Sequence, residues 1–496
     1  MAWTREKRYR SYTSWSQEEL TALRQQAARS PFKPGYHISP RSGLLNDPNG
    51  FSYFNGQWHV FYQSYPFGPV HGLKSWTHCV SSDLVHWQDL GLALLPTGKY
   101  DSHGTYSGSA LNVGDRLFLA YTGNVRDQTW QRHSYQNGAW LDQDGQITKC
   151  DQPLIMPPAH VTEHFRDPQL LKHGENYYIL AGAQDRTSLS GQFSWFKSTD
   201  LTTWKDQGYL KQPWDDLGFM VECPNLVLVD GSPVLIFCPQ GLAQQQLKYQ
   251  NIYPNTYSVG TAFNFEDGKF TADPASLTNL DEGFDVYASQ AFNAPNGKAY
   301  LISWIGLPEI DYPTDQENWA HCLSLVKELH VKDGQLIQQP VAAQSNLQDH
   351  ALTLVAAPWQ NSCQLLQRNA GQQYQLDLKI DADQQGCLLL AGSSDQAQGL
   401  RLEFNTGKQG QFTVDRGHAG TPFAKKYGTT RNCPLPAHQE LELKIFIDHS
   451  VCEIFVNGGE KVFTLRYFAP QTQTEIAFIG ENELKYSGRY YELKNM

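Results

Sequence analysis

The 496-residue sequence lacks the patterns that most directly indicate a metal site or a disulfide framework. Its 16 histidines include no His-Glu-x-x-His, and His71, His78 and His86 are too loosely spaced to indicate ligands. Its nine cysteines are odd in number and scattered, with no Cys-x-x-Cys. We therefore expect reduced thiols, no metal and no cofactor.

Basic residues are also in deficit. Lys and Arg total 39 against 50 Asp and Glu, which gives a formal net charge of -11. Nucleic-acid binding needs a concentrated basic surface, so no nucleic-acid partner is expected, and a neutral or small anionic substrate fits better. No apolar run is long enough to cross a bilayer, and residues 1–10 are charged without an apolar stretch. We expect a cytoplasmic protein with no membrane partner; its oligomeric state is unknown.

Long apolar helical stretches are scarce, whereas aromatic residues make up 12% of the chain and glycines number 40. This composition favours short strands and turns. The exception is a helix predicted over residues 16–30, with Ser16 as N-cap and Glu19 completing a capping box. It belongs to a helical extension over residues 1–34. The length of the chain indicates two further domains.

An internal repeat organises the first of them. Five segments combine a turn with alternating aromatic and aliphatic residues, and their starts lie about 60 residues apart. They are 56–63, 115–123, 175–182, 232–239 and 297–306. Two units also share Asp-Leu-x-x-Trp, at residues 83–87 and 200–204. A repeated small antiparallel sheet predicts a five-bladed β-propeller over residues 35–334, with a β-sandwich or barrel as the alternative.

The repeat then ends. Residues 335–356 are polar, Gln-rich and interrupted by Pro340, and are expected to be a linker with one short helix. Residues 357–496 carry period-two strand patterns and the hairpin turn Asn457-Gly458-Gly459. They predict a C-terminal β-sandwich, so the fold class is all-β.

Three acids begin three different units of the repeat. Asp47, Asp167 and Glu222 each precede a proline by one or two residues and then an apolar strand. Each alone is an ordinary strand-start residue. The innermost strands of a propeller converge on the central channel, however, and would bring the three carboxylates together. Paired carboxylates beside aromatic walls suit the cleavage of a glycosidic bond.

Four motifs carry a resemblance to a known family: Leu45-Asn-Asp-Pro-Asn-Gly50, Tyr106-Ser-Gly-Ser109, Phe165-Arg-Asp-Pro168 and Glu222-Cys-Pro224. Together they resemble glycoside hydrolase family 32, the β-fructofuranosidases, over residues 35 to about 330. Residues 448–457 are similar to the family's C-terminal sandwich motif. The departures are leucines at 44 and 45, where the family usually has an aromatic residue and Met, and Asn225 in place of a frequent Asp.

The resemblance implies a retaining mechanism in which Asp47 is the nucleophile, Glu222 the acid/base and Asp167 the transition-state stabiliser. Asp47 must be ionised and Glu222 protonated, and Arg166 is expected to keep Asp167 charged. The implied sugar contacts are Leu44, Leu45, Asn46, Gln63, Trp76, Tyr106, Ser107, Arg166, Tyr287 and Trp304. For Trp76, a place in the core is the open alternative.

The stretch 248–255 resembles the sucrose-6-phosphate branch of the family and makes Lys248 and Lys74 candidate phosphate contacts. The expected partner is therefore a small sugar: sucrose 6-phosphate, sucrose or a short fructo-oligosaccharide. A fructosyltransferase with the same three acids, and a sugar-binding protein without activity, are the alternatives.

Overall fold

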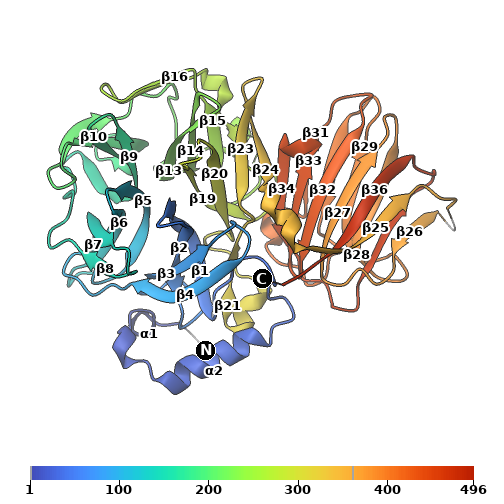
Figure 1. Ribbon diagram of the computed structural model, residues 1–496, viewed down its shortest axis with the longest axis horizontal. Coiled ribbons are helices and arrows are strands. Elements are labelled where there is room, and N and C mark those ends of the chain that lie inside the picture. Colours follow the sequence, from blue (N-terminus) through green and yellow to red (C-terminus); the bar gives the residue numbers. More distant parts are fainter. Residues whose placement is uncertain (1–2, 248, 360–361, 496) are drawn as a thin grey trace.

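In the computed structural model, which describes residues 3–247, 249–359 and 362–495, the chain is almost entirely β and forms two bodies side by side (Figure 1). The first is a ring of five antiparallel sheets and the second a pair of packed six-stranded sheets. The predicted five-bladed propeller followed by a β-sandwich is confirmed. No helix in the described ranges is long and apolar enough to cross a membrane.

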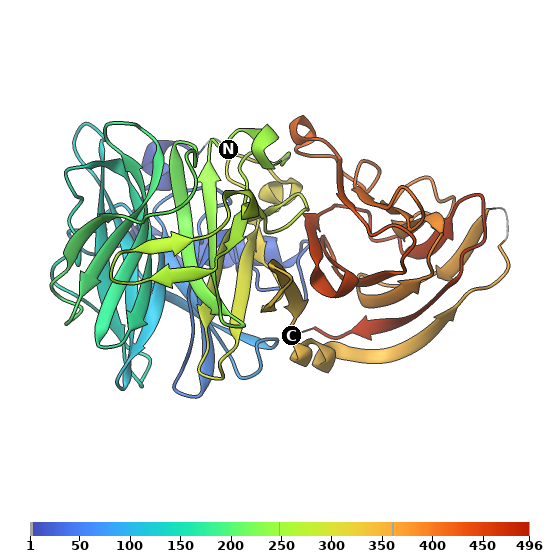
Figure 2. The same ribbon diagram turned by 90° about the horizontal axis from the view of Figure 1, so that it is seen from above.

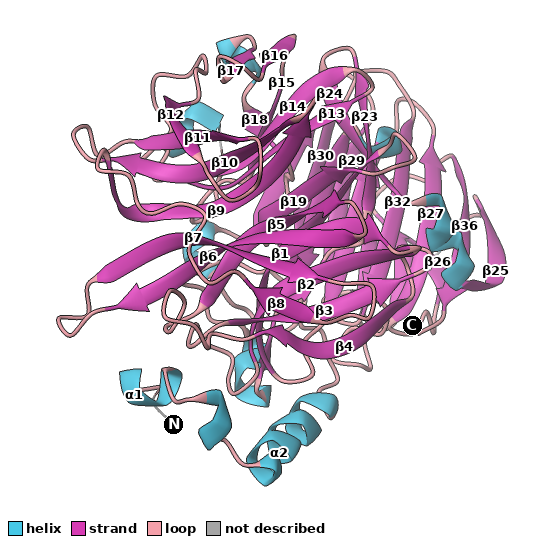
Figure 3. Cartoon of the chain, turned by 60° about the vertical axis from the view of Figure 1, so that its left-hand side comes forward, coloured by secondary structure: helices cyan, strands magenta, loops and turns pink. Residues whose placement is uncertain are grey.

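The N-terminal segment forms α1 (Arg5–Arg8), a 3₁₀ turn η1 (Tyr12–Ser14) and α2 (Gln17–Ala28), which lie outside the strands of the propeller (Figure 3). The predicted capping box is present. The Ser16 hydroxyl accepts a hydrogen bond from the Glu19 amide at 3.1 Å, and the Glu19 carboxylate accepts one from the Ser16 amide at 2.8 Å. The helix ends at Ala28, two residues before the predicted end.

Each blade is an antiparallel sheet whose first strand lies at the axis. Blade 1 holds β1 (Gly43–Phe54), β2 (Gln57–Tyr65), β3 (Ser75–Ser81) and β4 (Trp87–Leu94). Blade 2 holds β5 (Thr105–Val113), β6 (Arg116–Arg126), β7 (Arg132–Leu141) and β8 (Ile147–Lys149). Blade 3 holds β9 (Val161–His173), β10 (Asn176–Asp185), β11 (Gly191–Ser198) and β12 (Lys205–Tyr209). Blade 4 holds β13 (Met220–Val229), β14 (Ser232–Gln240), β15 (Thr256–Val259) and β18 (Thr278–Asn279). Blade 5 holds β19 (Val286–Asn293), β20 (Ala299–Ile305), β23 (Lys327–Lys332) and β24 (Gln335–Pro340).

Short elements complete the propeller: α3 (Gln244–Leu247), β16 (Ala262–Asn264), β17 (Lys269–Thr271), η2 (Pro274–Ser276), η3 (Pro313–Glu317), β21 (Trp319–Ala320) and β22 (Cys322–Leu323). The five repeated sequence segments are the second strands of the five blades: β2, β6, β10, β14 and β20. The shared Asp-Leu-x-x-Trp forms equivalent turns before β4 and β12. In both, the aspartate accepts two backbone N–H groups, and Leu84 and Leu201 have positive φ.

The ring of inner strands is closed by polar side chains that bind the backbone of neighbouring strands. These residues recur about 60 positions apart, in step with the repeat: Asn49, Ser109, Gln169, Asn225 and Gln290. Gln290 joins the last blade to the first, because its Oε1 accepts the Phe51 N–H at 2.7 Å and its Nε2 donates to the Gly108 carbonyl at 2.8 Å. In addition, β21 pairs in parallel with β1.

The predicted linker is mostly strand. Residues Gln335–Pro340 pair with β23 as the outer strand of blade 5, and Gln348–Val355 form β25 of the sandwich. Only residues 341–347 connect the two bodies, and they contain the one expected short helix, η4 (Ala342–Leu347). The polar Gln-rich composition misled the prediction, since edge strands expose many of their side chains.

The sandwich packs two sheets over an apolar core (Figure 2). One sheet holds β25, β36 (Tyr486–Leu493), β27 (Gln373–Ile380), β32 (Leu441–Asp448), β33 (Val451–Val456) and β34 (Lys461–Arg466). The other holds β26 (Cys363–Gln367), β35 (Glu475–Ile479), β28 (Gln385–Gly392), β29 (Leu400–Asn405), β30 (Gln411–Asp415) and β31 (Thr430–Pro434). Two 3₁₀ turns, η5 (Lys425–Tyr427) and η6 (Asn457–Gly459), lie in its connections.

Candidate active site

The inner strands are irregular where the acids lie. The pairing of β1 with β2 shifts between Leu45 and Pro48, and that of β13 with β14 shifts between Glu222 and Asn225. Proline cannot donate to a ladder, so the strand bulges there. Asp167 itself has φ 64°, a conformation uncommon outside glycine that a bulged strand imposes. These bulges turn the side chains of the acids toward the end of the channel.

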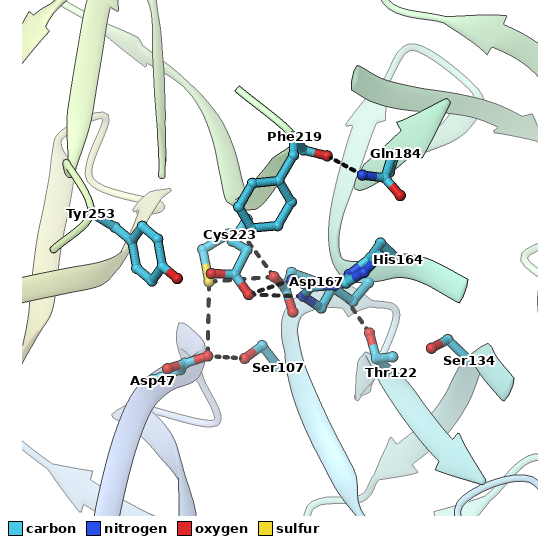
Figure 4. A network of polar contacts seen from close by, with 12 residues as sticks. Asp47, Ser107, Thr122, Ser134, His164, Asp167, Gln184, Phe219, Cys223 and Tyr253 are labelled. Atoms are coloured by element: carbon cyan, nitrogen blue, oxygen red, sulfur yellow. Dashed lines mark hydrogen bonds and ion pairs between the residues drawn. The ribbon is translucent and has the colours of Figure 1, made fainter. Parts of the chain in front are cut away.

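Asp47 is held by three donors. Its Oδ1 accepts a hydrogen bond from Asn46 Nδ2 at 2.9 Å, and its Oδ2 accepts one from Gln63 Nε2 at 2.9 Å. Its Oδ2 also accepts a hydrogen bond from the Ser107 hydroxyl (Figure 4). Asn46 is fixed in turn by Lys74, whose Nζ donates to its Oδ1 at 2.7 Å. Donors on both oxygens fix the direction of this carboxylate, which suits a nucleophile.

Asp167 lies deeper than Asp47. Its Oδ2 accepts the Cys223 N–H at 3.0 Å, and the Cys223 thiol lies 3.6 Å from Asp167 Oδ2 and 3.9 Å from Asp47 Oδ2 (Figure 4). Burial raises the pKa of Asp167 to about 7; Arg166 opposes this shift, while the charges of Glu222 and Asp47 add to it. Arg166 therefore favours the charged form of Asp167, as expected, but desolvation and two neighbouring carboxylates outweigh the guanidinium.

Arg166 instead pairs with Glu222. Its Nε donates to Glu222 Oε1 at 2.8 Å, its Nη2 lies 2.8 Å from the same oxygen, and the Tyr287 hydroxyl donates to Oε2 at 2.6 Å. A guanidinium has no acceptor, so Oε1 must stay unprotonated. A proton on Glu222 therefore belongs on Oε2, where the Tyr287 hydroxyl can reverse its role and accept.

These groups face one cavity of about 510 Å³ at the end of the propeller channel. The expected sugar contacts that line it are Asn46, Gln63, Tyr106, Arg166, Tyr287 and Trp304, together with Lys74 and the three acids. The Ser107 hydroxyl donates to Asp47. Lys74 is buried against Asn46, and Lys248 lies outside the described residues.

Three expected contacts are wrong. Leu44 and Leu45 are buried in apolar clusters, at 1% and 0% exposure, and neither lines the cavity. Trp76 is fully buried between blades 1 and 2, with its Nε1 donating to the Tyr106 carbonyl at 3.0 Å. It is a core residue that holds Tyr106 in place. The bulge after Leu45 breaks the alternation that would otherwise place a side chain of residues 44–45 at the channel.

The mouth of the cavity contains residues that the sequence did not single out. They come from the N-terminal extension and from the β6–β7 hairpin: Trp3, Arg5, Arg8, Tyr9, Arg126, Trp130 and Arg132. His71 lines the cavity as well. The basic start of the chain was visible in the sequence, but nothing local connects it to an opening of the propeller.

Converging carboxylates in a cavity at the axis of a β-propeller, with a β-sandwich beside it, define a glycoside hydrolase. Residues 37–340 match the Glycosyl hydrolases family 32 N-terminal domain, and residues 337–491 match the Glycosyl hydrolases family 32 C terminal. The chain belongs to glycosyl hydrolases family 32.

Its relatives are similar over nearly their whole lengths. A sucrose-6-phosphate hydrolase of Pediococcus pentosaceus is 50% identical over 97% of this chain and 95% of its own, and one of Streptococcus mutans is 45% identical over 98% of both. The structure of sucrose-6-phosphate hydrolase from Lactobacillus gasseri matches with a TM-score of 0.97 at 50% identity, covering 100% of both chains. A Bombyx mori GH32 β-fructofuranosidase mutant in complex with sucrose matches with a TM-score of 0.84 at 27% identity, covering 98% of this chain and 99% of its own.

Proposed function

We propose that this protein is a retaining β-fructofuranosidase that cleaves sucrose 6-phosphate between its fructosyl and glucosyl units. The observation that carries the proposal is the pairing of a tethered carboxylate, Asp47, with an acid held by Arg166 and Tyr287, Glu222, in one cavity. The names of the relatives from Pediococcus, Streptococcus and Lactobacillus support the phosphorylated substrate. The sucrose complex of the Bombyx enzyme supports sucrose as a second substrate.

In the first step, Asp47 attacks the anomeric carbon of the fructosyl unit. The bond from that carbon to the bridging oxygen breaks, and Glu222 gives its Oε2 proton to this oxygen as the glucosyl unit leaves. The product is a fructosyl ester on Asp47. Asn46, Gln63 and Ser107 keep the attacking carboxylate in place, so little motion is needed to reach the carbon.

In the second step, Glu222 is a carboxylate and takes a proton from water. The water oxygen bonds to the anomeric carbon and Asp47 leaves, which frees fructose with its original anomeric configuration. Asp167 accepts hydrogen bonds from fructosyl hydroxyls, which strengthen as positive charge develops on the sugar ring. Burial and the two neighbouring carboxylates raise its pKa, so Asp167 ionises less readily than a free carboxyl group.

Replacing each key carboxylate tests this assignment. The wild type is expected to release glucose 6-phosphate and fructose, whereas D47N and E222Q lower kcat by about 10⁴-fold or more, because one loses the nucleophile and the other the transferable proton. Coupled assays measure both products, and unchanged thermal melting of the variants is the control. A wild type that binds sucrose without cleaving it would make the protein a binder. Higher oligosaccharides in place of fructose at high sucrose would make it a transferase.

A further inference from the structure

Four arginines converge at the mouth of the active cavity from two distant parts of the chain. Arg5 and Arg8 come from α1, and Arg126 and Arg132 come from the end of β6 and the start of β7. We call them the mouth arginines. Across residues 3–247, 249–359 and 362–495, none of the four forms an ion pair with a carboxylate. A chain with a net charge of -11 has thus gathered unneutralised positive charge at one opening.

Contacts within the protein use only some of the N–H donors of the mouth arginines. Arg5 stacks over the Trp130 ring at 4.5 Å, and Arg8 Nε donates to the Trp3 carbonyl at 3.1 Å. Arg126 Nη1 donates to the Trp130 carbonyl at 3.2 Å, but its buried Nε has no partner. Arg8, Arg126 and Arg132 are half buried, whereas Arg5 is exposed, and like charges near one another without a counter-ion destabilise the fold. An anion that enters the mouth would neutralise this charge.

The N-terminal segment is packed against the propeller at this opening. The Leu73 N–H donates to the Arg8 carbonyl at 2.8 Å, and the Tyr65 hydroxyl donates to the Lys7 carbonyl at 3.0 Å. The close approach depends on glycine, because a Cβ at Gly68 would lie 1.9 Å from the Trp3 ring. These contacts fix α1 to blade 1.

The same segment also reaches blade 2. Tyr9 packs edge-on against Trp130, with ring centroids 5.0 Å apart. Trp130 lies at the tip of the β6–β7 hairpin with φ 68°, in a loop shaped by Asp127, whose side chain accepts the Thr129 and Gln131 N–H groups. α1 therefore bridges blades 1 and 2 and holds its two arginines opposite the other two.

The proposed reaction fixes the orientation of the substrate in the cavity. With the fructosyl unit against Asp47 at the base, the glucosyl unit extends outward, and a phosphate on its C6 oxygen reaches the mouth. Guanidinium groups bind phosphate with paired N–H donors. We propose that Arg5, Arg8, Arg126 and Arg132 bind the phosphate of sucrose 6-phosphate, so that the N-terminal extension is part of the substrate site. This inference rests on the proposed function.

Substitutions test it with two substrates side by side. R126Q, R132Q and the double variant R5Q/R8Q are each expected to lower kcat/KM for sucrose 6-phosphate by about 10- to 100-fold, since hydrogen bonds to charged groups contribute about 1.5–3 kcal/mol. The loss is expected in KM, because the phosphate is remote from the reacting atoms. Activity on sucrose is expected to change less than threefold. R126K retains a charge and is expected to lose less than R126Q.

Two arginines that do not line the cavity provide controls. Arg29 lies at the exposed C-terminal end of α2, and Arg116 lies at the opposite end of β6 from Arg126, so the control variants are R29Q and R116Q. Both are expected to leave the preference for sucrose 6-phosphate over sucrose unchanged. Glucose 6-phosphate is a second probe: it is expected to inhibit sucrose cleavage by the wild type and to inhibit R126Q and R132Q at least tenfold more weakly.

Outcomes separate this inference from the proposed function. An equal fall on both substrates in the variants would assign the mouth arginines a structural role and overturn the phosphate site. An unchanged preference for sucrose 6-phosphate, or unchanged inhibition by glucose 6-phosphate, would overturn it as well. A wild type that cleaves neither sugar would instead refute the proposed function.

Discussion

Two groups of buried acids lie in this molecule, and they are treated in opposite ways. One faces the cavity and contains Asp47, Asp167 and Glu222. The other lies between the propeller and the sandwich and contains Asp448 and Glu453, both fully buried. Both groups consist of carboxylates removed from water, which costs free energy unless each charge is matched.

At the domain interface the matching is complete. His37 Nδ1 lies 2.8 Å from Asp448 and its Nε2 lies 3.1 Å from Glu453, while Lys327 Nζ lies 3.2 Å from Glu453. Burial alone would lower the pKa of His37, but the two carboxylates raise it to about 9. Burial alone would raise the pKa of Glu453, but Lys327 and His37 lower it to about 2. Asp448 also accepts the backbone N–H groups of residues 35, 36 and 37.

In the cavity the matching is partial. Arg166 binds Glu222, and Lys74 donates to Asn46 and not to an acid. Burial lowers the pKa of Lys74 to about 8 and raises that of Asp167 to about 7. Acids that hold two domains together are therefore neutralised, and acids that perform chemistry are left with charge or a proton to give.

The largest effect on stability is expected from breaking the interface. D448N leaves the His37 imidazolium facing one carboxylate in place of two and weakens the acceptor of three backbone N–H groups. It is expected to destabilise the protein by about 3–5 kcal/mol, seen as a lower melting temperature, while the folded enzyme keeps its kcat. D349N, which changes an exposed acid, is the control. Equal melting temperatures of D448N and wild type would contradict a stabilising role for this group.

An opposite effect is expected in the cavity. The pKa of Asp167 rises from 3.8 to about 7 on folding, so its ionisation costs the folded state stability progressively as the pH rises between these values. D167N removes that cost. It is expected to raise stability at pH 8 by about 2–4 kcal/mol, given about 1.4 kcal/mol per pKa unit, and by less at pH 5, while activity falls. Melting curves at the two pH values measure this, and a gain that is equal at both, or absent, would show that Asp167 is not strained by its charge.

The propeller could be predicted from the repeat because the alternating pattern of each blade's second strand is complete within about eight to ten residues. The acids were predictable because proline marks each bulge. The effect of each bulge on the neighbouring residues could not be predicted. The bulge in β1 places Asn46 at the cavity and Leu45 in the core. Side-chain partners on different blades could not be predicted from the sequence either. Arg166 adjoins Asp167 in the chain, yet it binds Glu222.

The mouth of the cavity was the least predictable part. Tyr9 and Trp130 meet only because two blades and a terminal segment pack together. A contact of that sequence separation leaves no local pattern. The basic character of residues 5–10 could be read from the sequence, but not the opening that it serves.

The smallest expected effect comes from removing one buried tyrosine hydroxyl that donates to a carboxylate. Tyr287 donates to Glu222 Oε2 at 2.6 Å in the cavity, and Tyr312 donates to Asp285 Oδ1 at 2.8 Å where Asp285 contacts Arg416. Both hydroxyls are buried against a carboxylate, so Y287F and Y312F remove the same group. Y287F is expected to lower kcat about tenfold, as expected for the loss of one charged hydrogen bond.

The pH profile separates the two variants. Because Y287F removes a hydrogen-bond partner of the acid/base Glu222, it is expected to change the pH profile of kcat/KM, with little change in melting temperature. Y312F is expected to lower the melting temperature and leave the profile unchanged, because Asp285 is neutralised by Arg416 at 2.6 Å and takes no part in proton transfer. If both variants changed only stability, the Tyr287 hydroxyl would be one more structural partner, and Glu222 would hold its proton without it.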